Sequence, residues 1–257
     1  MTMKKMMFVL IVLCSVANLW SQDKKEDRNF RIPLLGEQAP SFTAESTSGT
    51  INFPGDYGRR WKVLFSHPQD FTPVCSSEIL ELTNLQNEFE KIKTQLVVVS
   101  TDALATHQDW KKALEQINFK DRGTKQIKFP LVADANLSVA KLYGMIHSQT
   151  NSTKDVRGVF IIDPDNVLRA MFFYPLNVGR NTEEIVRTIS ALQTADEMHV
   201  STPADWKYGD DVLVRYLNAD DAKKLAENKA EGIYKVSWFM TYKKMGNISE
   251  AGSGDNK

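Results

Sequence analysis

Four short, almost continuous apolar runs constrain the fold of this chain more than any other feature of its sequence. They are WKVLFS at 61–66, QLVVVS at 95–100, FPLVAD at 129–134 and GVFIID at 158–163. Apolar runs of this length without polar alternation are typical of strands that are buried on both faces of a sheet. We therefore expect these four runs to belong to one buried sheet.

Amphipathic helical patterns accompany the apolar runs. Apolar residues recur at steps of three and four in two stretches, and a third stretch at 181–193 places three apolar residues on one face. The residues that define these patterns are Ile79, Leu82, Leu85, Phe89 and Ile92 in the first, Trp110, Leu114 and Ile117 in the second, and Ile185, Ile189 and Leu192 in the third. Each stretch predicts one helix.

Two hairpin patterns complete the expected sheet. The stretch at 41–53 alternates around a Ser-Gly turn and predicts an edge hairpin. A DPDN turn at 163–166 precedes the apolar stretch at 167–174, which predicts an antiparallel return strand. Strands that alternate with helices, together with this return, predict an α/β sandwich around a central mixed sheet.

The first 21 residues have the pattern of an export signal. Two lysines are followed by an apolar run of about 15 residues and then by a polar stretch. A membrane helix needs about 20 apolar residues, whereas this run is shorter and is interrupted by Ser15 and Asn18. We expect cleavage near Ala17 or Ser21 and a periplasmic or secreted protein. An uncleaved anchor and a cytosolic protein with an apolar start are the alternatives.

The number of cysteines matters because of the expected export. Cys14 lies inside the apolar run and would be removed with it, which leaves Cys75 as the one thiol of the mature chain. A single cysteine is often only a small buried apolar residue. In a compartment where cysteines are usually paired, a lone thiol is also a candidate for reactivity.

The residues before Cys75 favour a reactive thiol. Thr72 is a good N-cap residue, and Pro73 suits the first helical position, where the missing N–H carries no cost. Cys75 then falls in the first turn, where free backbone N–H groups and the helix dipole favour an anion. We expect Glu78 in the same turn, where its charge would oppose a thiolate somewhat. A reactive thiolate needs this placement, and a buried structural cysteine does not.

The same stretch resembles a known family. Pro68, Thr72 and Cys75 have the P-x-x-x-T-x-x-C spacing of the peroxiredoxins, and the stretch at 66–75 is similar to their one-cysteine, peroxiredoxin-six-like branch. The resemblance covers about residues 32–242. The later stretches that carry it are STDALATHQDW (100–110), FPLVAD (129–134), RGVFIIDP (157–164), YPLNVGRNTEEI (174–185) and TPADWKYGDDV (202–212).

The resemblance implies a thioredoxin-like fold, a C-terminal dimerisation arm and the reduction of peroxides. By this resemblance Cys75 attacks the peroxide, Thr72 hydrogen-bonds the thiolate and the incoming oxygen, and Pro68 covers the pocket. Arg157 would set its guanidinium against the sulfur. A surface arginine at the head of a strand is the alternative for Arg157.

Two further residues match family positions near the substrate pocket. They are Arg180, in the stretch GRN, and His67. For His67, a hydrogen-bonded histidine that shapes the loop is an equal alternative. The four histidines of the sequence lack the close spacing of metal ligands. We therefore expect neither a metal nor another cofactor.

The implied reaction reduces hydrogen peroxide and organic hydroperoxides to water or alcohols. Attack on the peroxide would convert Cys75 to a sulfenic acid, and no second thiol remains to resolve it once the signal has been removed. An external thiol reductant of the thioredoxin, glutaredoxin or glutathione type is therefore expected as a partner. A secreted peroxide sensor or holdase that uses the same thiol without turnover is the alternative.

Other activities fit the sequence less well. A thiol–disulfide oxidoreductase needs C-x-x-C, and a cysteine hydrolase needs a paired histidine that the sequence does not mark. Some relatives in this branch carry a phospholipase serine in a G-x-S-x-G-like stretch, whereas residues 54–61 hold Tyr57 and no serine. Basic and acidic residues are equal in number, at 32 each, which argues against a surface for nucleic acid.

The helical and strand patterns weaken after residue 195. The expected domains are a signal peptide at 1–21, a thioredoxin-like peroxiredoxin domain at 32–195, an arm domain at 196–245 and a flexible tail at 246–257. The apolar stretch at 233–242 would be largely exposed in a monomer, and a large exposed apolar patch is typical of an interface. We expect a homodimer in which the arm crosses to the other subunit. An arm that folds back on its own chain is the alternative.

Overall fold

The computed structural model describes residues 31–151, 153–215, 218–227 and 231–246. The predicted signal peptide at 1–21, which includes Cys14, lies outside the described residues, as does the predicted tail after residue 246. Among the helices of the described ranges, none has the length and apolar character that crossing a membrane requires.

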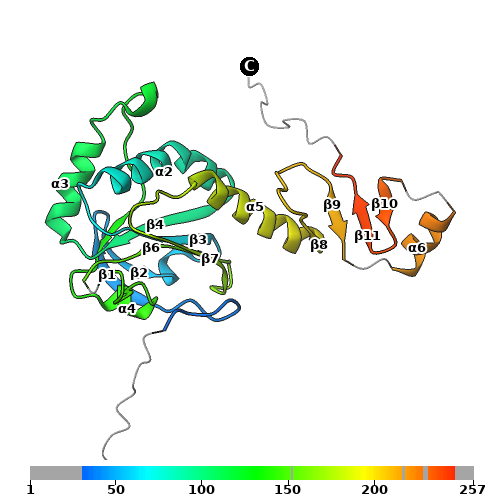
Figure 1. Ribbon diagram of the computed structural model, residues 1–257, viewed down its shortest axis with the longest axis horizontal. Coiled ribbons are helices and arrows are strands. Elements are labelled where there is room, and N and C mark those ends of the chain that lie inside the picture. The colour runs from blue at the N-terminus through cyan, green and yellow to red at the C-terminus, as the bar shows by residue number, and fades with distance from the viewer. Residues whose placement is uncertain (1–30, 152, 216–217, 228–230, 247–257) are drawn as a thin grey trace, which may run out of the picture. The chain divides into compact units, whose positions relative to one another are not determined.

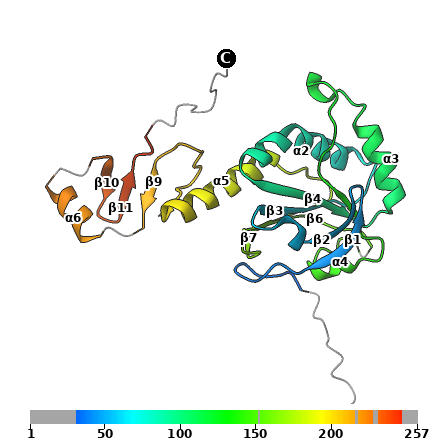
Figure 2. The ribbon, with the colours of Figure 1, turned by 180° about the vertical axis from the view of Figure 1, so that it is seen from behind.

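Seven strands form one mixed sheet in the order β2-β1-β5-β4-β3-β6-β7 (Figure 1). Their bounds are β1 Phe42–Ser46, β2 Gly49–Phe53, β3 Trp61–Ser66, β4 Thr94–Ser100, β5 Leu131–Ala133, β6 Arg157–Ile162 and β7 Leu168–Tyr174. β4 pairs parallel with β3 and β5, whereas β6 pairs antiparallel with β3 and β7. The four apolar runs are thus neighbouring central strands, which Figure 2 shows from behind, and the predicted hairpin and return strand form the two edges.

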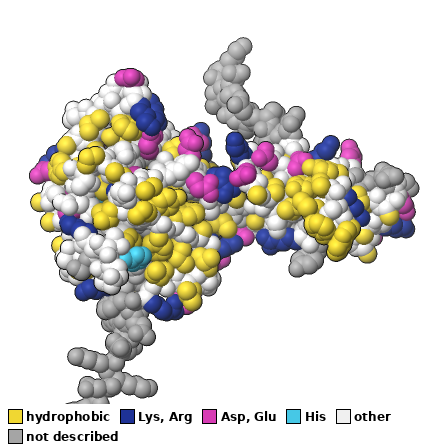
Figure 3. Space-filling view, viewed as in Figure 1, with side chains coloured by type: hydrophobic (Ala, Val, Ile, Leu, Met, Phe, Trp, Pro, Cys, Tyr) yellow, Lys and Arg dark blue, Asp and Glu magenta, His cyan; other side chains and the backbone are white. Residues whose placement is uncertain are grey.

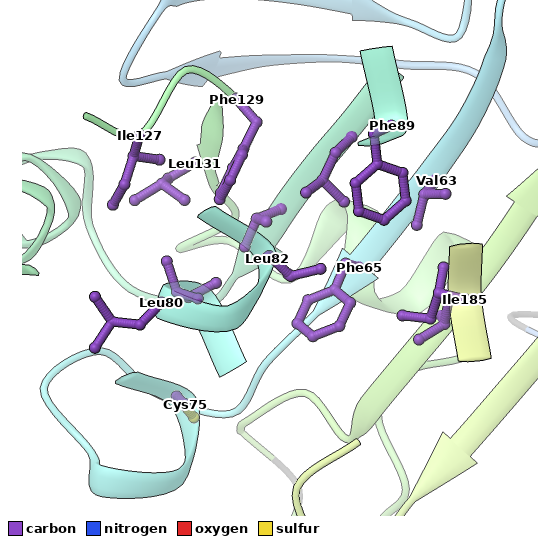
Figure 4. Packing of buried hydrophobic residues seen from close by; sticks show 14 of the residues in the cluster. Val63, Phe65, Cys75, Leu80, Leu82, Phe89, Ile127, Phe129, Leu131 and Ile185 are labelled. Atoms are coloured by element: carbon purple, nitrogen blue, oxygen red, sulfur yellow. The ribbon is translucent and has the colours of Figure 1, made fainter. Parts of the chain in front are cut away.

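The central strands are apolar on both faces because the sheet separates two hydrophobic cores. Along β3, Val63 and Phe65 belong to one core and Leu64 to the other. The first core is closed by α2, α3 and α5, and the second by the β1–β2 hairpin and α4. These helices are α2 Pro73–Lys91, α3 Leu104–Leu114, α4 Ser138–Leu142 and α5 Thr182–Met198. Figure 4 shows Phe65 between Leu82 of α2 and Ile185 of α5.

The helices differ from the sequence prediction in three places. α3 ends at Leu114, so Ile117 follows the helix and is 41% exposed instead of completing its apolar face. α4 was not predicted, and its first N–H groups at Val139 and Ala140 are held by the carboxylate of Asp134. α5 continues past the predicted end at 193 to Met198.

A second, four-stranded sheet follows α5 in the sequence, in the order β10-β11-β9-β8. Its strands are β8 Val200–Ser201, β9 Val212–Val214, β10 Ile233–Ser237 and β11 Met240–Lys243, and the helix α6 Ala219–Ala226 lies between β9 and β10 in the sequence. A small core of its own forms around the buried Trp206, which packs with Ala191 of α5, Val200 and Val212. Hydrophobic side chains also gather on the surface of this sheet (Figure 3).

Candidate active site

The loop between β3 and α2 carries three of the predicted site residues, His67, Pro68 and Thr72. Thr72 has the extended backbone of an N-cap, and Pro73 begins α2 at its first position, as the sequence predicts. Proline suits this position because its fixed φ is helical and its missing N–H would have been unpaired. The Thr72 hydroxyl does not cap the helix, however, and donates instead to the carbonyl of Gln69 at 2.8 Å.

Cys75 lies in the first turn of α2 and is fully buried. Its side chain belongs to the core between the sheet and α2 (Figure 4). The Nη1 group of Arg157 donates to its sulfur at 3.3 Å. The guanidinium of Arg157 is therefore in direct hydrogen-bond contact with the sulfur.

Arg157 is held in place by groups other than the sulfur. It is the first residue of β6, and its Nε and Nη2 both donate to the carbonyl of Leu176, at 3.0 and 2.7 Å. Its Nη1 also donates to a carboxylate oxygen of Glu78 at 2.7 Å. These contacts fix the plane of the guanidinium, so Nη1 stays directed toward Cys75. Arg157 is buried, and the alternative of a surface arginine is wrong.

Glu78 joins the two predicted arginines. Its Oε1 accepts from the backbone N–H and the Nε of Arg180, and its Oε2 accepts from Arg180 Nη2 and Arg157 Nη1, all at 2.7–2.9 Å. Our expectation that Glu78 opposes the thiolate from the first turn is wrong, because it lies beyond that turn with its charge compensated by both guanidinium groups. Two cations and one carboxylate leave one buried positive charge, which a thiolate at Cys75 would balance.

Arg180 forms the second layer of the site. Its Nη1 donates to the carbonyls of Ser66 and Gly158, each at 2.8 Å, and its guanidinium lies 3.3 Å from the ring centre of Phe65. Burial lowers the pKa of Arg180 below its ordinary value, while Glu78 and Cys75 act in the opposite direction. Arg180 thus ties Glu78 to β3 and β6, whereas the hydrogen bond to the Cys75 sulfur comes from Arg157.

A cavity of about 230 Å³ adjoins this network. Three of the predicted residues, Pro68, Thr72 and Arg157, contribute to its walls. The other lining residues are Gln69, Pro73, Val74, Asn151, Lys154 and Leu176. The cavity therefore lies against the same guanidinium that contacts the sulfur, and a small ligand in it meets Arg157. The individual roles given to Pro68 and Thr72 stay predictions.

His67 belongs to a different cluster. Its imidazole is fully buried and does not line the cavity, and its ring centre lies 5.0 Å from Trp110 and 6.3 Å from His107. Its two ring nitrogens make no hydrogen bond. Burial is the main reason why the pKa of His67 lies well below its ordinary value, with the neighbouring positive charges adding to the effect. The role of His67 stays a prediction.

Sequence reasoning missed Glu78 as a site residue. Its spacing held a usable signal, because residues three apart on a helix lie on the same face and Glu78 follows Cys75 by three positions. An acidic residue placed on the buried side of a helix requires cationic partners. The two predicted arginines were the available candidates.

Family comparisons agree with the geometry. Residues 35–171 match the model of the AhpC/TSA family, and residues 191–229 match that of the C-terminal domain of 1-Cys peroxiredoxin. A peroxiredoxin of Methanosarcina mazei is 43% identical over 215 residues, which are 83% of this chain and 98% of the relative.

Solved structures give the same result. The yeast mitochondrial 1-Cys peroxiredoxin is similar with a TM-score of 0.72 and 35% identity, covering 83% of this chain and 100% of the other. Peroxiredoxin 6 of Arenicola marina also gives a TM-score of 0.72, with 33% identity over 84% of this chain and 99% of the other. These likenesses confirm the thioredoxin-like α/β fold.

Proposed function

This chain belongs to the peroxiredoxin family and is a thiol-dependent peroxidase, and from this premise we propose that Cys75 reduces hydrogen peroxide and organic hydroperoxides in a one-cysteine cycle. The observation that supports it best is the 3.3 Å contact between the Cys75 sulfur and Arg157 beside a small cavity. A thiolate at this position lies beside a fixed cation, and that same residue, Arg157, lines a cavity that could hold a small substrate.

In the first step the Cys75 thiolate attacks one peroxide oxygen. The S–O bond forms as the O–O bond breaks, so the sulfur is oxidised to a sulfenic acid and the peroxide is reduced. The leaving oxygen takes up a proton and departs as water or an alcohol. Arg157 stabilises the negative charge that moves from sulfur to the leaving oxygen during this step.

Ionisation alone contributes little to the rate. A thiol of ordinary pKa, about 8.5, is a few per cent ionised at pH 7, so complete ionisation gains only about 30-fold. A thiolate of lower pKa is also a weaker nucleophile. The larger contribution therefore comes from the oriented guanidinium, because preorganised donors are worth roughly 100- to 1,000-fold each.

The cycle closes with an external thiol reductant and no bound cofactor. One reductant thiol attacks the sulfenic acid and releases water, and a second thiol displaces Cys75 from the mixed disulfide. The yeast mitochondrial 1-Cys peroxiredoxin, which this chain resembles, has a thiol-resolving mechanism via the glutathione and thioredoxin systems. A reductant of one of these types is what we propose here, and peroxide consumption with each added separately identifies it.

Replacement of the thiol tests the proposal most simply. Cys75→Ser is nearly isosteric but far less ionised, so peroxide turnover with added reductant should fall to less than a few per cent. Cys14→Ser, the matched control at the other cysteine, should keep full activity. If the unaltered protein consumed one equivalent of peroxide and then stopped, the result would favour the peroxide sensor or holdase. Peroxide turnover by Cys75→Ser equal to that of the unaltered protein would overturn the assignment.

We also propose that the arm, residues 196–245, forms a homodimer. The β10–β11 hairpin exposes Val236 in β10 and Trp238 and Phe239 in its turn, at 63%, 89% and 68%. An apolar group so exposed is better explained by a covering partner than by contact with water. Sedimentation should show a dimer, and Trp238→Ser with Phe239→Ser should shift it toward monomer. A compact monomer of the unaltered chain at micromolar concentration would contradict this.

Export is the third part of the proposal. The basic start and short apolar run at 1–21 support a cleaved signal and a periplasmic or secreted enzyme. The intact mass of the protein from its native source should lack this segment. A full-length mass would contradict cleavage.

A further inference from the structure

A second buried polar cluster uses the same loop as the active site. Asp70 lies in the loop between β3 and α2, His67 starts that loop, and His107 lies on α3. Asp70 Oδ2 lies 2.7 Å from His107 Nδ1, and Asp70 Oδ1 lies 3.5 Å from His67 Nε2. Each of the three residues offers one atom that could ligate a metal, and these three atoms lie within 4.8 Å of one another. All three side chains are buried.

The hydrogen bonds of His107 orient one nitrogen toward this cluster. Its Nε2 lies 3.0 Å from the carbonyl of Val132. A carbonyl can only accept, so Nε2 must carry a proton. Nδ1 is therefore the nitrogen that faces the cluster, where it shares a hydrogen bond with Asp70 Oδ2. A histidine that donates its outer N–H to a backbone carbonyl has the arrangement of a metal ligand.

His67 gives an independent reason to expect a ligand. Both of its ring nitrogens are buried without a hydrogen-bond partner, and one oxygen of Asp70, Oδ1, is unpartnered as well. A polar group that is buried without a partner destabilises the folded protein. Two of these atoms, His67 Nε2 and Asp70 Oδ1, face each other at 3.5 Å. A group that accepts lone pairs from both would remove this cost.

We propose that His67, Asp70 and His107 bind a divalent cation of the zinc type. Two imidazoles and one carboxylate are a ligand set that Zn²⁺ uses commonly, and no thiolate is needed. The cation would take the place of the proton between His107 and Asp70, so one proton leaves as the metal binds. Spacing along the sequence does not reveal the site, because His67 and His107 are 40 positions apart.

A bound cation would connect the active-site loop to α3. His67 and Asp70 belong to the loop that also supplies Pro68 and Thr72 to the cavity beside Cys75. The backbone N–H of Asp70 is already held by the carboxylate of Asp102 at 2.8 Å. The metal would therefore stabilise the loop in the conformation that forms the cavity. This site is separate from the peroxide chemistry and does not depend on it.

Zinc binding can be measured without any activity assay. The full chain carrying Cys75→Ser, which removes the catalytic thiol as a competing ligand, is treated with chelator and titrated with Zn²⁺ against a chromophoric chelator. We expect one tightly bound Zn²⁺ per chain. His67→Gln and Asp70→Asn should each weaken binding by at least about 100-fold, since even outer partners of ligands are worth 10- to 100-fold. His147→Gln is the matched control and should change nothing.

X-ray absorption at the zinc edge of the unaltered protein covers the case in which a ligand variant fails to fold. We expect scattering from two imidazoles and an oxygen ligand. Sulfur scattering would show that the ion binds to a cysteine instead, and it would overturn the proposal. Absence of stoichiometric binding, or equal binding by the parent and by folded Asp70→Asn, would overturn it too.

Discussion

Two buried polar clusters differ in how completely their groups are hydrogen-bonded. The active-site cluster consists of Cys75, Glu78, Arg157 and Arg180, and the histidine cluster consists of His67, Asp70 and His107. In the active-site cluster Glu78 accepts four hydrogen bonds from the two arginines. In the histidine cluster one short hydrogen bond joins His107 to Asp70, whereas His67 Nε2 lies 3.5 Å from Asp70 Oδ1 without hydrogen-bond geometry.

The difference separates two uses of buried polar residues. The active-site cluster is complete except for one negative charge, which the proposed thiolate of Cys75 would supply. Its guanidinium is already oriented before substrate arrives, which is the condition for electrostatic catalysis. The histidine cluster lacks a partner for neutral nitrogens, which is the condition for binding a cation. Full pairing thus prepares one site for chemistry, and incomplete pairing prepares the other for a ligand.

Removal of the Glu78 charge should have the largest effect on stability. Glu78→Gln leaves two buried guanidinium groups without a carboxylate, and breaking a buried ion pair from one side costs about 3–5 kcal/mol. Denaturant unfolding of the reduced protein measures this loss. The matched control is Glu81→Gln on the same helix, whose partners Lys120 and Arg122 are solvent-exposed, and it should cost about 1 kcal/mol or less. Equal costs for both variants would contradict the pairing described here.

The pH dependence of stability should show a smaller effect that belongs to His67. The pKa of His67 in the folded protein lies well below its ordinary value of 6.5, chiefly through burial. As pH falls below 6.5 the unfolded chain takes up this proton and the folded chain does not, so the free energy of unfolding decreases by up to about 1.4 kcal/mol per pH unit.

Comparison of metal-free variants isolates the contribution of His67 to the pH dependence of stability. Asp70 has a raised pKa, mainly through burial, and contributes with the opposite sign at lower pH, so the parent profile alone mixes the two. His67→Gln should lose stability less steeply than the parent below pH 6.5, while His147→Gln should follow the parent. Parallel profiles for the parent and His67→Gln would show that His67 titrates normally.

The sequence predicted well what depends on local pattern. The run at 61–66 lacks polar alternation because Val63 and Leu64 enter different cores, so the buried strand is visible in the residues themselves. The helix start at Pro73 is likewise visible, since proline is suited to the first position and few others. Family spacing then added Arg157 and Arg180, which do lie next to Cys75 and Glu78.

What the sequence could not give depends on tertiary contact. A local view of Glu78 counts only its repulsion of Cys75, because its two partners follow it by 79 and 102 positions. His67 and His107 meet only after β3 and α3 have packed. The fold decides which charged and hydrogen-bonding partners a buried polar group meets. The role of Glu78 was therefore reversed and the proximity of His67 and His107 was missed, although every strand of the main sheet was located.

In the proposed mechanism an oriented guanidinium, more than ionisation of the thiol, accelerates attack on the peroxide. The direct measurement is the second-order rate of Cys75 with hydrogen peroxide in Arg157→Lys, divided by the thiolate fraction from its ultraviolet absorbance. Lysine keeps the charge but loses the planar fork, so we predict that this quotient falls by about 100-fold or more. Arg169→Lys, at a site that pairs with Asp196 instead, should leave it unchanged. An equal quotient in Arg157→Lys and the parent would contradict the claim.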